Sequence, residues 1–165
     1  MRLAALAATV TLAGCSAADD PDNVPLKGDW EVALDVTEVN FGGIDLSGLR
    51  LPPEFAALAR RERFCAEPRF SSLEAMQDDL DRHLDGRCVI ESYQADDRSI
   101  SGSGRCEQVS DPALEYRPNL QFRGQLTETY YELAVTLEGD ATVPQVGRRN
   151  LRMVARVQGQ RAGDC

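Results

Sequence analysis

The sequence has a single histidine, His83, and no two cysteines in the close Cys-x-x-Cys spacing that zinc sites use. A Ser-His-Asp hydrolase would therefore need His83, and the candidate Ser103 lies in a Ser-Gly-Ser-Gly stretch that lacks the spacing of a nucleophile elbow. No glycine-rich loop has the spacing that cradles phosphate. We therefore expect no catalytic residue, no cofactor and no bound metal.

Basic residues are also few. The chain has 18 Lys and Arg against 27 Asp and Glu, which gives a net charge of −9. Binding to nucleic acid requires a basic surface, so the composition excludes DNA and RNA as expected partners. It also argues against a protein that lies flat on anionic lipid, and favours an acidic surface that keeps the protein soluble.

No apolar run is long enough to cross a bilayer of about 30 Å as a helix. The apolar run at the start, residues 3–13, follows Arg2 and leads into the tetrad Leu-Ala-Gly-Cys at Cys15. A basic start, a short apolar core and small residues at the cleavage point are typical of a secretory signal. The tetrad resembles the bacterial lipobox, which implies that residues 1–14 are a signal peptide and that Cys15 is lipidated.

The lipobox resemblance also implies a location. Two or three acyl chains on Cys15 would hold the protein stably in a membrane, whereas one chain would not. Ser16 follows the cysteine, where an Asp often retains lipoproteins at the inner membrane. We therefore expect a lipid-anchored protein of the bacterial cell envelope, on the outer membrane and facing the periplasm. Residues 15–27 are then the lipidated cysteine and a flexible tether, and residues 28–165 are a single domain.

Four cysteines remain when Cys15 carries lipid: Cys65, Cys88, Cys106 and Cys165. An even number in an oxidising compartment predicts two disulfides, with three possible pairings. We favour Cys88–Cys106, because these residues bracket a predicted hairpin almost symmetrically. Centring that hairpin on Asp97 places residue 90 opposite 104 and residue 92 opposite 102. Cys65–Cys165 would then join the helical region to the C-terminus.

Period-two alternation of apolar and polar residues is the main structural signal. It covers four segments: 30–37, 120–126, 131–137 and 151–157. Each would bury one face and expose the other, as strands of antiparallel sheets do. Residues 88–93 and 100–106 predict two more strands, joined by a turn over 95–99. The expected fold is mainly β: a curved antiparallel sheet or partly open barrel with one or two short helices.

The helices are predicted in the middle of the chain. Ser71 and Glu74 form a capping box, and an apolar stripe follows at Leu73, Met76, Leu80 and Leu84 until Gly86 ends the run. A shorter helix is predicted over residues 53–62, with its prolines at the start. Residues 41–48 and 111–118 are predicted as loops.

Two short patterns carry a resemblance to a known family. Gly28-x-Trp30-Glu31 opens the first strand, and the chain ends in Gly159-x-Arg161-x-Gly163-x-Cys165. Together with the spaced cysteines, they are similar to a family of small Gram-negative envelope proteins known only as a domain of unknown function. The resemblance covers about residues 28–165, but the chain differs from the family over 41–53. It implies export, β-architecture and disulfides, and no activity.

Two groups of side chains are candidates for ligand binding. Trp30, Tyr130 and Tyr131 lie at predicted strand ends and are candidates to line a pocket inside the sheet, although we favour core positions for them. Four acidic residues are candidates for weak calcium binding: Asp78, Asp79, Asp81 and Asp85. The twelfth position from Asp81 is Ser92 rather than the glutamate a calcium loop needs, so a solvated helix end is favoured.

These observations favour a protein that is not an enzyme. We expect it to bind an apolar ligand inside the curved sheet. The alternative is a structural or assembly partner that acts through contacts with another envelope protein. The first function predicts a concave apolar cavity between inward-facing strand residues. The second predicts a filled core and an exposed apolar patch.

Overall fold

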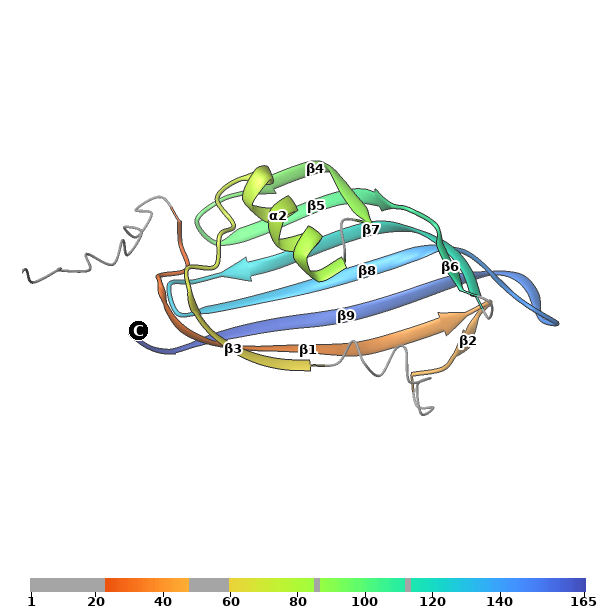
Figure 1. Ribbon diagram of the computed structural model, residues 1–165, viewed down its shortest axis with the longest axis horizontal. Coiled ribbons are helices and arrows are strands. Elements are labelled where there is room, and N and C mark those ends of the chain that lie inside the picture. Colours follow the sequence, from red (N-terminus) through yellow and green to blue (C-terminus); the bar gives the residue numbers. More distant parts are fainter. Residues whose placement is uncertain (1–22, 48–59, 85–86, 112–113) are drawn as a thin grey trace, which may run out of the picture.

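The computed structural model describes residues 23–47, 60–84, 87–111 and 114–165. Within these residues, nine strands form one antiparallel sheet and a single helix packs against it (Figure 1). The elements are β1 (Gly28–Phe41), β2 (Ile44–Asp45), β3 (Arg60–Ala66), α2 (Leu73–Leu84), β4 (Cys88–Ala95), β5 (Ser99–Cys106), β6 (Val109–Asp111), β7 (Leu114–Leu126), β8 (Tyr130–Val143) and β9 (Gly147–Gly163).

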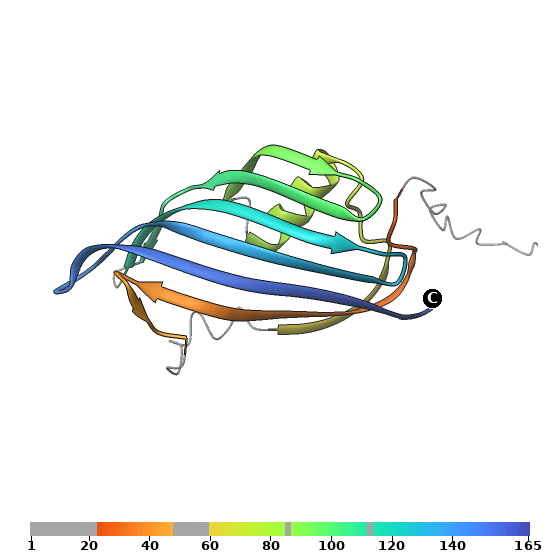
Figure 2. The same cartoon turned by 180° about the vertical axis from the view of Figure 1, so that it is seen from behind.

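The long strands follow the order β1-β9-β8-β7-β5-β4, seen from behind in Figure 2. Strands β2 and β3 pair with different parts of the outer edge of β1, and β6 pairs with β7. Among the described strands, β4 does not pair with β2 or β3, so the sheet is not closed into a barrel. This is the curved antiparallel sheet that the period-two alternation predicts.

Residues directly opposite one another on neighbouring strands share a face, so the registers place apolar side chains in rows across the sheet. One row runs from Val36 through Ala155 and Val135 to Phe122. The rows form two buried clusters on the concave face. Trp30, Ile100 and Leu120, each at most 2% exposed, belong to the larger cluster, which Met76 of α2 also joins. The second cluster consists of Val39, Tyr116, Ala141, Leu151 and Met153.

The registers shift at three places, one of them between Asp29 and Trp30, and the other two change which residues of the bulged strand face inward. In β1 the register against β9 shifts between Val36 and Glu38, so the buried positions change from even to odd numbers and Val39 takes the next core place. In β4 the register shifts between Ile90 and Ser92. Ile90 therefore lies opposite Gly104 as predicted, whereas the prediction that residue 92 opposes 102 is wrong: Ser92 pairs with Ser103 instead.

Three further local predictions are wrong. Residues 60–62 belong to β3 rather than to a helix, because pairing with β1 overrides the local helical pattern; residues 53–59 lie outside the described residues. The predicted loop 41–48 contains β2. The predicted loop 111–118 contains the start of β7. Pro118 is tolerated in this strand because β5 pairs with β7 only from Asn119 onward, so the proline lies outside that pairing.

The start of helix α2 also differs from the prediction. Ser72, rather than Ser71, is the N-terminal cap: its Oγ accepts a hydrogen bond from the backbone N–H of Ala75 at 3.2 Å. Met76 is buried and Leu80 partly buried against the core, as the apolar stripe predicts. Leu73, however, is 45% exposed at the first turn. Gly86 lies outside the described residues.

The folded domain begins before Gly28, so the predicted tether over 15–27 is too long. Asn23 is 5% exposed, and its side-chain N–H groups donate to the carbonyls of Pro25 and Pro68 at 2.9 and 2.8 Å. Its Oδ1 accepts the backbone N–H of Phe70 at 3.1 Å. A buried polar side chain is stable only when it is satisfied in this way, so residues 23–27 are part of the packed domain.

The sheet brings β4 and β5 unusually close at Gly104. A Cβ atom there would lie 2.1 Å from the carbonyl oxygen of Val89. Because that oxygen belongs to the backbone of a paired strand, it cannot move aside as a flexible side chain would. Glycine is therefore required at this position by packing.

We expect Gly104→Ala to lower the free energy of unfolding by about 2–3 kcal/mol, the cost of forcing backbone apart in a packed region. Urea denaturation followed by circular dichroism measures the change. Gly163→Ala is the matched control, because a Cβ there meets no atom within 4 Å. Equal losses in the two variants would contradict the close approach at Gly104.

Candidate functional site

Five aliphatic side chains form a half-buried patch on the concave face of β1, β8 and β9, here called the aliphatic strip: Leu34, Val36, Val135, Ala155 and Val157. The register makes them neighbours, since Leu34 lies opposite Val157, and Ala155 lies between Val36 and Val135. The strip lies on the same face as the two buried clusters.

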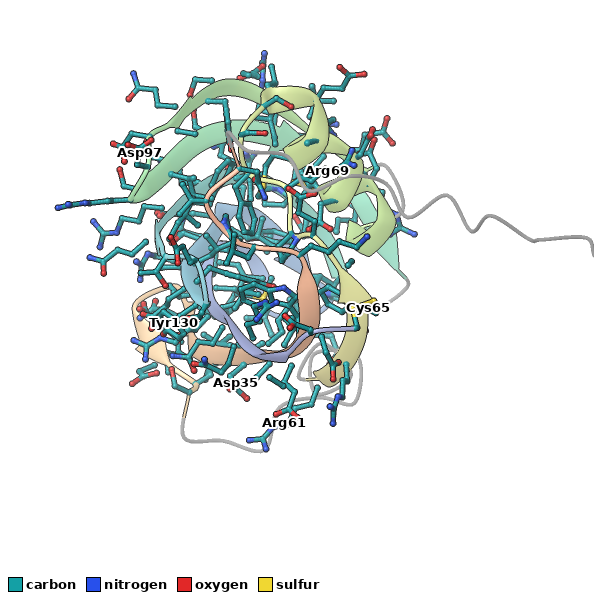
Figure 3. All side chains as sticks on the ribbon, turned by 90° about the vertical axis from the view of Figure 1, so that its left-hand side faces the viewer. Asp35, Arg61, Cys65, Arg69, Asp97 and Tyr130 are labelled. Atoms are coloured by element: carbon teal, nitrogen blue, oxygen red, sulfur yellow. A yellow bond between two sulfur atoms is a disulfide. The ribbon has the colours of Figure 1, made fainter. Side chains whose placement is uncertain are left out.

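The curvature of the sheet encloses this face. The end-on view shows the sheet curled around the interior side chains, with α2 on one side and β3 near Cys65 at the sheet's edge (Figure 3). Labelled Asp35, Arg61 and Tyr130 point outward from the curl (Figure 3). Along β7 and β8 the alternation therefore separates an apolar interior from a polar exterior.

Two of the three aromatic candidates belong to the core. Trp30 is fully buried, its ring centroid lies 5.4 Å from that of Tyr131, and its Nε1–H donates to the carbonyl of Leu26 at 3.0 Å. Tyr131 also contacts Phe70 edge-on at 5.0 Å. The preference for core positions is confirmed for Trp30 and Tyr131. Tyr130 instead lies on the convex face, where its hydroxyl donates to Glu132 at 2.7 Å.

The convex face carries paired charges. Arg152 forms ion pairs with Glu38 and Glu138, and Arg148 contacts Asp140 at 2.5 Å. These pairs are largely exposed, so each contributes at most about 1 kcal/mol. A groove of about 730 Å³ on this face is lined mainly by polar side chains of β7, β8 and β9. Such a lining does not suit an apolar ligand, which leaves the concave face as the better candidate.

The largest pKa shifts come from burial of tyrosines. Burial raises the pKa of Tyr93 to about 12, and it also raises the pKa of Tyr116 and Tyr131. The charges of Asp79 on α2 and Glu62 on β3 add to the effect on Tyr131. On the convex face, hydrogen bonds from Tyr130 and Gln158 lower the pKa of Glu132.

These tyrosines predict a loss of stability at alkaline pH. An unfolded tyrosine loses its proton near pH 10, whereas folded Tyr93 keeps its proton to about pH 12. The unfolded state therefore binds fewer protons above pH 10, and the free energy of unfolding should fall as pH rises toward 12. Urea denaturation at pH 8, 10 and 11 measures this, with Tyr93→Phe as the variant whose slope is reduced. An unchanged stability between pH 8 and 11 would contradict the prediction.

Both favoured disulfides are present. Cys88 is joined to Cys106 across β4 and β5, and Cys65 is joined to Cys165. The first pair lies directly opposite in the register, as the predicted hairpin requires. The second ties β3 to the end of the chain after β9, and both of these strands pair with β1.

The remaining predicted residues do not assemble into a site. Ser103 shares a hydrogen bond of 2.8 Å with Ser92, and both hydroxyls are exposed. His83 lies in α2, but its side chain is outside the described part of the chain, as are Cys15 and Asp85. Among the described residues, no three His, Cys, Asp or Glu side chains lie close enough to hold a metal ion.

One polar residue at the sheet edge was not predicted from the sequence. Gln77 of α2 reaches β4, where its Nε2 donates to the carbonyl of Cys88 at 2.8 Å and its Oε1 accepts the N–H of Ile90 at 2.8 Å. The amide group thus pairs with β4 as a neighbouring strand would. No local signal marks this role, because it depends on how α2 packs on β4.

Among the described helices, none is long and apolar enough to cross a membrane. The chain matches no protein-family model, no curated protein and no solved structure.

Proposed function

We propose that this protein is a lipid-anchored protein of the bacterial cell envelope that binds an elongated apolar ligand along the aliphatic strip. The observation that carries the proposal is the strip itself: half-buried aliphatic side chains on the concave face of a sheet whose convex face is covered with ion pairs. Ligand pockets are concave and mostly apolar, and they take up ligands by removing such surface from water.

The strip contains no charged side chain, so an aliphatic chain is a better match for it than an aromatic cation or a sugar. Neighbouring residues along a strand are about 3.3 Å apart, so Leu34 and Val36 are separated along β1 by only a few methylene lengths. A single acyl chain that lies along the strand can therefore contact both side chains. A fatty acid therefore has the right chemistry and shape. On this proposal the protein carries or senses an acyl chain in the envelope and performs no reaction on it.

Titration with palmitate tests ligand binding. The Cys15→Ser protein is used because it needs no detergent, and isothermal titration calorimetry gives the dissociation constant. We expect saturable binding that Leu34→Gln weakens about tenfold by removing one apolar contact. Ala33→Gln is the matched control, because Ala33 directly precedes Leu34 in β1 and its side chain faces the opposite side of the strand. No saturable binding by the parent protein, or equal binding by the two variants, would refute the proposal.

The anchor is tested separately. Intact mass spectrometry of protein extracted from membranes should show the acyl groups on Cys15, and Cys15→Ser should lack them. Recovery of the unsubstituted protein as a soluble periplasmic chain with a free N-terminus would overturn the lipoprotein assignment. That result would leave the palmitate titration unaffected, so the two parts of the proposal fail independently.

A further inference from the structure

A second surface lies at the other end of the sheet order, between helix α2 and strand β4. It is a groove of about 690 Å³, here called the edge groove, lined by Ser72, Leu73, Glu74, Gln77, Asp78, Asp81, Cys88, Val89 and Ile90. Leu73 is 45% exposed and Val89 is 60% exposed. These are two of the four large hydrophobic side chains that the described residues expose, and both line this one groove.

The edge groove is held in a fixed shape. Gln77 bonds to the backbone of β4 at Cys88 and Ile90, and its Nε2 also donates to Asp81 at 2.7 Å. The disulfide from Cys88 to Cys106 fixes the same end of β4 to β5. A preformed groove loses little conformational entropy when a partner binds.

The same contacts decide how a partner can bind. Sheet edges commonly recruit partners by adding a strand, which requires unsatisfied backbone groups. At Cys88 and Ile90 these groups are already bonded to Gln77. A partner must therefore use its side chains, with apolar groups that contact Leu73 and Val89.

The charge of the groove sets the chemistry of that partner. Glu74, Asp78 and Asp81 are among the lining residues, and the lining contains no Arg, Lys or His among the residues that the structure describes. These carboxylates give the groove a negative potential, which attracts basic side chains. An anionic lipid surface is disfavoured for the same reason.

The geometry points to the edge groove as the docking site for a protein partner that presents an amphipathic helix with large apolar side chains flanked by Lys or Arg. The apolar side chains contact Leu73 and Val89, and the basic ones pair with Glu74. This site shares no residue with the aliphatic strip, so it does not depend on the proposed ligand. It assigns the protein a role in recognising another protein of basic, amphipathic character.

Three synthetic peptides test the inference on the Cys15→Ser protein. The first is a helical peptide with leucines at i, i+3, i+4 and i+7 and lysines elsewhere. The second has the same composition in a scrambled order, which keeps the charge and loses the apolar stripe. The third replaces the lysines with glutamates. We expect only the first to bind, with chemical-shift changes in NMR spectra centred on α2 and β4.

Variants then locate the site. Leu73→Ser with Val89→Ser should weaken binding of the first peptide at least about tenfold, because each removes an apolar contact. Val146→Ser is the matched control, since this side chain is 53% exposed but does not line the groove. Circular dichroism establishes that each variant is folded.

Three outcomes would overturn the inference. Equal binding of the scrambled peptide would show that net charge alone attracts basic peptides. Concentration-dependent dimerisation in analytical ultracentrifugation, abolished by Leu73→Ser with Val89→Ser, would show that a second copy of this chain occupies the groove. Weakened peptide binding in Leu34→Gln would place the peptide on the aliphatic strip and would also refute the inference.

Discussion

Replacing Trp30 with alanine is expected to lower the free energy of unfolding by about 3–5 kcal/mol, the range for truncating a large buried aromatic side chain. Trp30 is fully buried in the larger core cluster and stacks at a tilt against Tyr131. Its indole N–H also bonds to Leu26, which lies in the segment that packs before β1. The substitution therefore leaves a cavity and releases that segment.

The measurement is urea denaturation followed by far-ultraviolet circular dichroism, because the chain has one tryptophan and the variant loses its fluorescence signal. Trp30→Phe separates the two contributions: it keeps an aromatic ring in the core and loses the hydrogen bond, which is worth about 1 kcal/mol. Tyr130→Phe on the convex face is the control for a partly exposed aromatic residue outside the core. A loss below about 1 kcal/mol for Trp30→Ala would show that the residue is not in the core.

Removing the disulfide between Cys65 and Cys165 is expected to cost about 4–5 kcal/mol. The two cysteines are 100 residues apart in the sequence. Their bridge restricts the unfolded chain, and a loop of this length stabilises the folded state by about 4.7 kcal/mol in the chain-entropy description. The bridge also joins β3 to the end of the chain after β9, and both strands pair with β1.

The double variant Cys65→Ala with Cys165→Ala tests this by urea denaturation without reductant. Adding reductant to the unsubstituted protein checks the same quantity but also opens Cys88–Cys106, whose loop of 18 residues is worth about 3 kcal/mol. Reductant should therefore lower stability further than the double variant does. If the double variant is as stable as the parent, the bridge does not constrain the unfolded chain.

Much of the fold follows from local pattern. The alternation in residues 131–137 and 151–157 predicts strands because a period of two buries one face only in an extended chain. The disulfide between Cys88 and Cys106 was predictable because a tight hairpin fixes which residues are opposite. The core positions of Trp30 and Tyr131 follow from the same alternation combined with their size.

Other features had no local signal. The bulge after Ile90 shifts the hairpin register by one residue, and nothing in residues 90–92 marks it. Residues 60–62 have a helical pattern but form β3, because hydrogen bonds to β1 outweigh a propensity difference of under about 1 kcal/mol. The burial of Asn23 depends on the carbonyl of Pro68 and the backbone N–H of Phe70, which lie 45 and 47 residues away in the sequence.

The sequence by itself determined the main strands of the sheet, the alternating faces of β7 and β8, and the disulfide pairing across the hairpin, because these depend on neighbours within a few residues. Only the tertiary structure decided which surfaces stay partly open. The aliphatic strip is assembled from β1, β8 and β9, and the edge groove from α2 and β4. The hydrogen bonds from Gln77 to the backbone of β4, which hold the edge groove, form only because α2 packs on β4. Contacts between distant segments depend on how the sheet curves and where the helix lies, and no local pattern of residues encodes either.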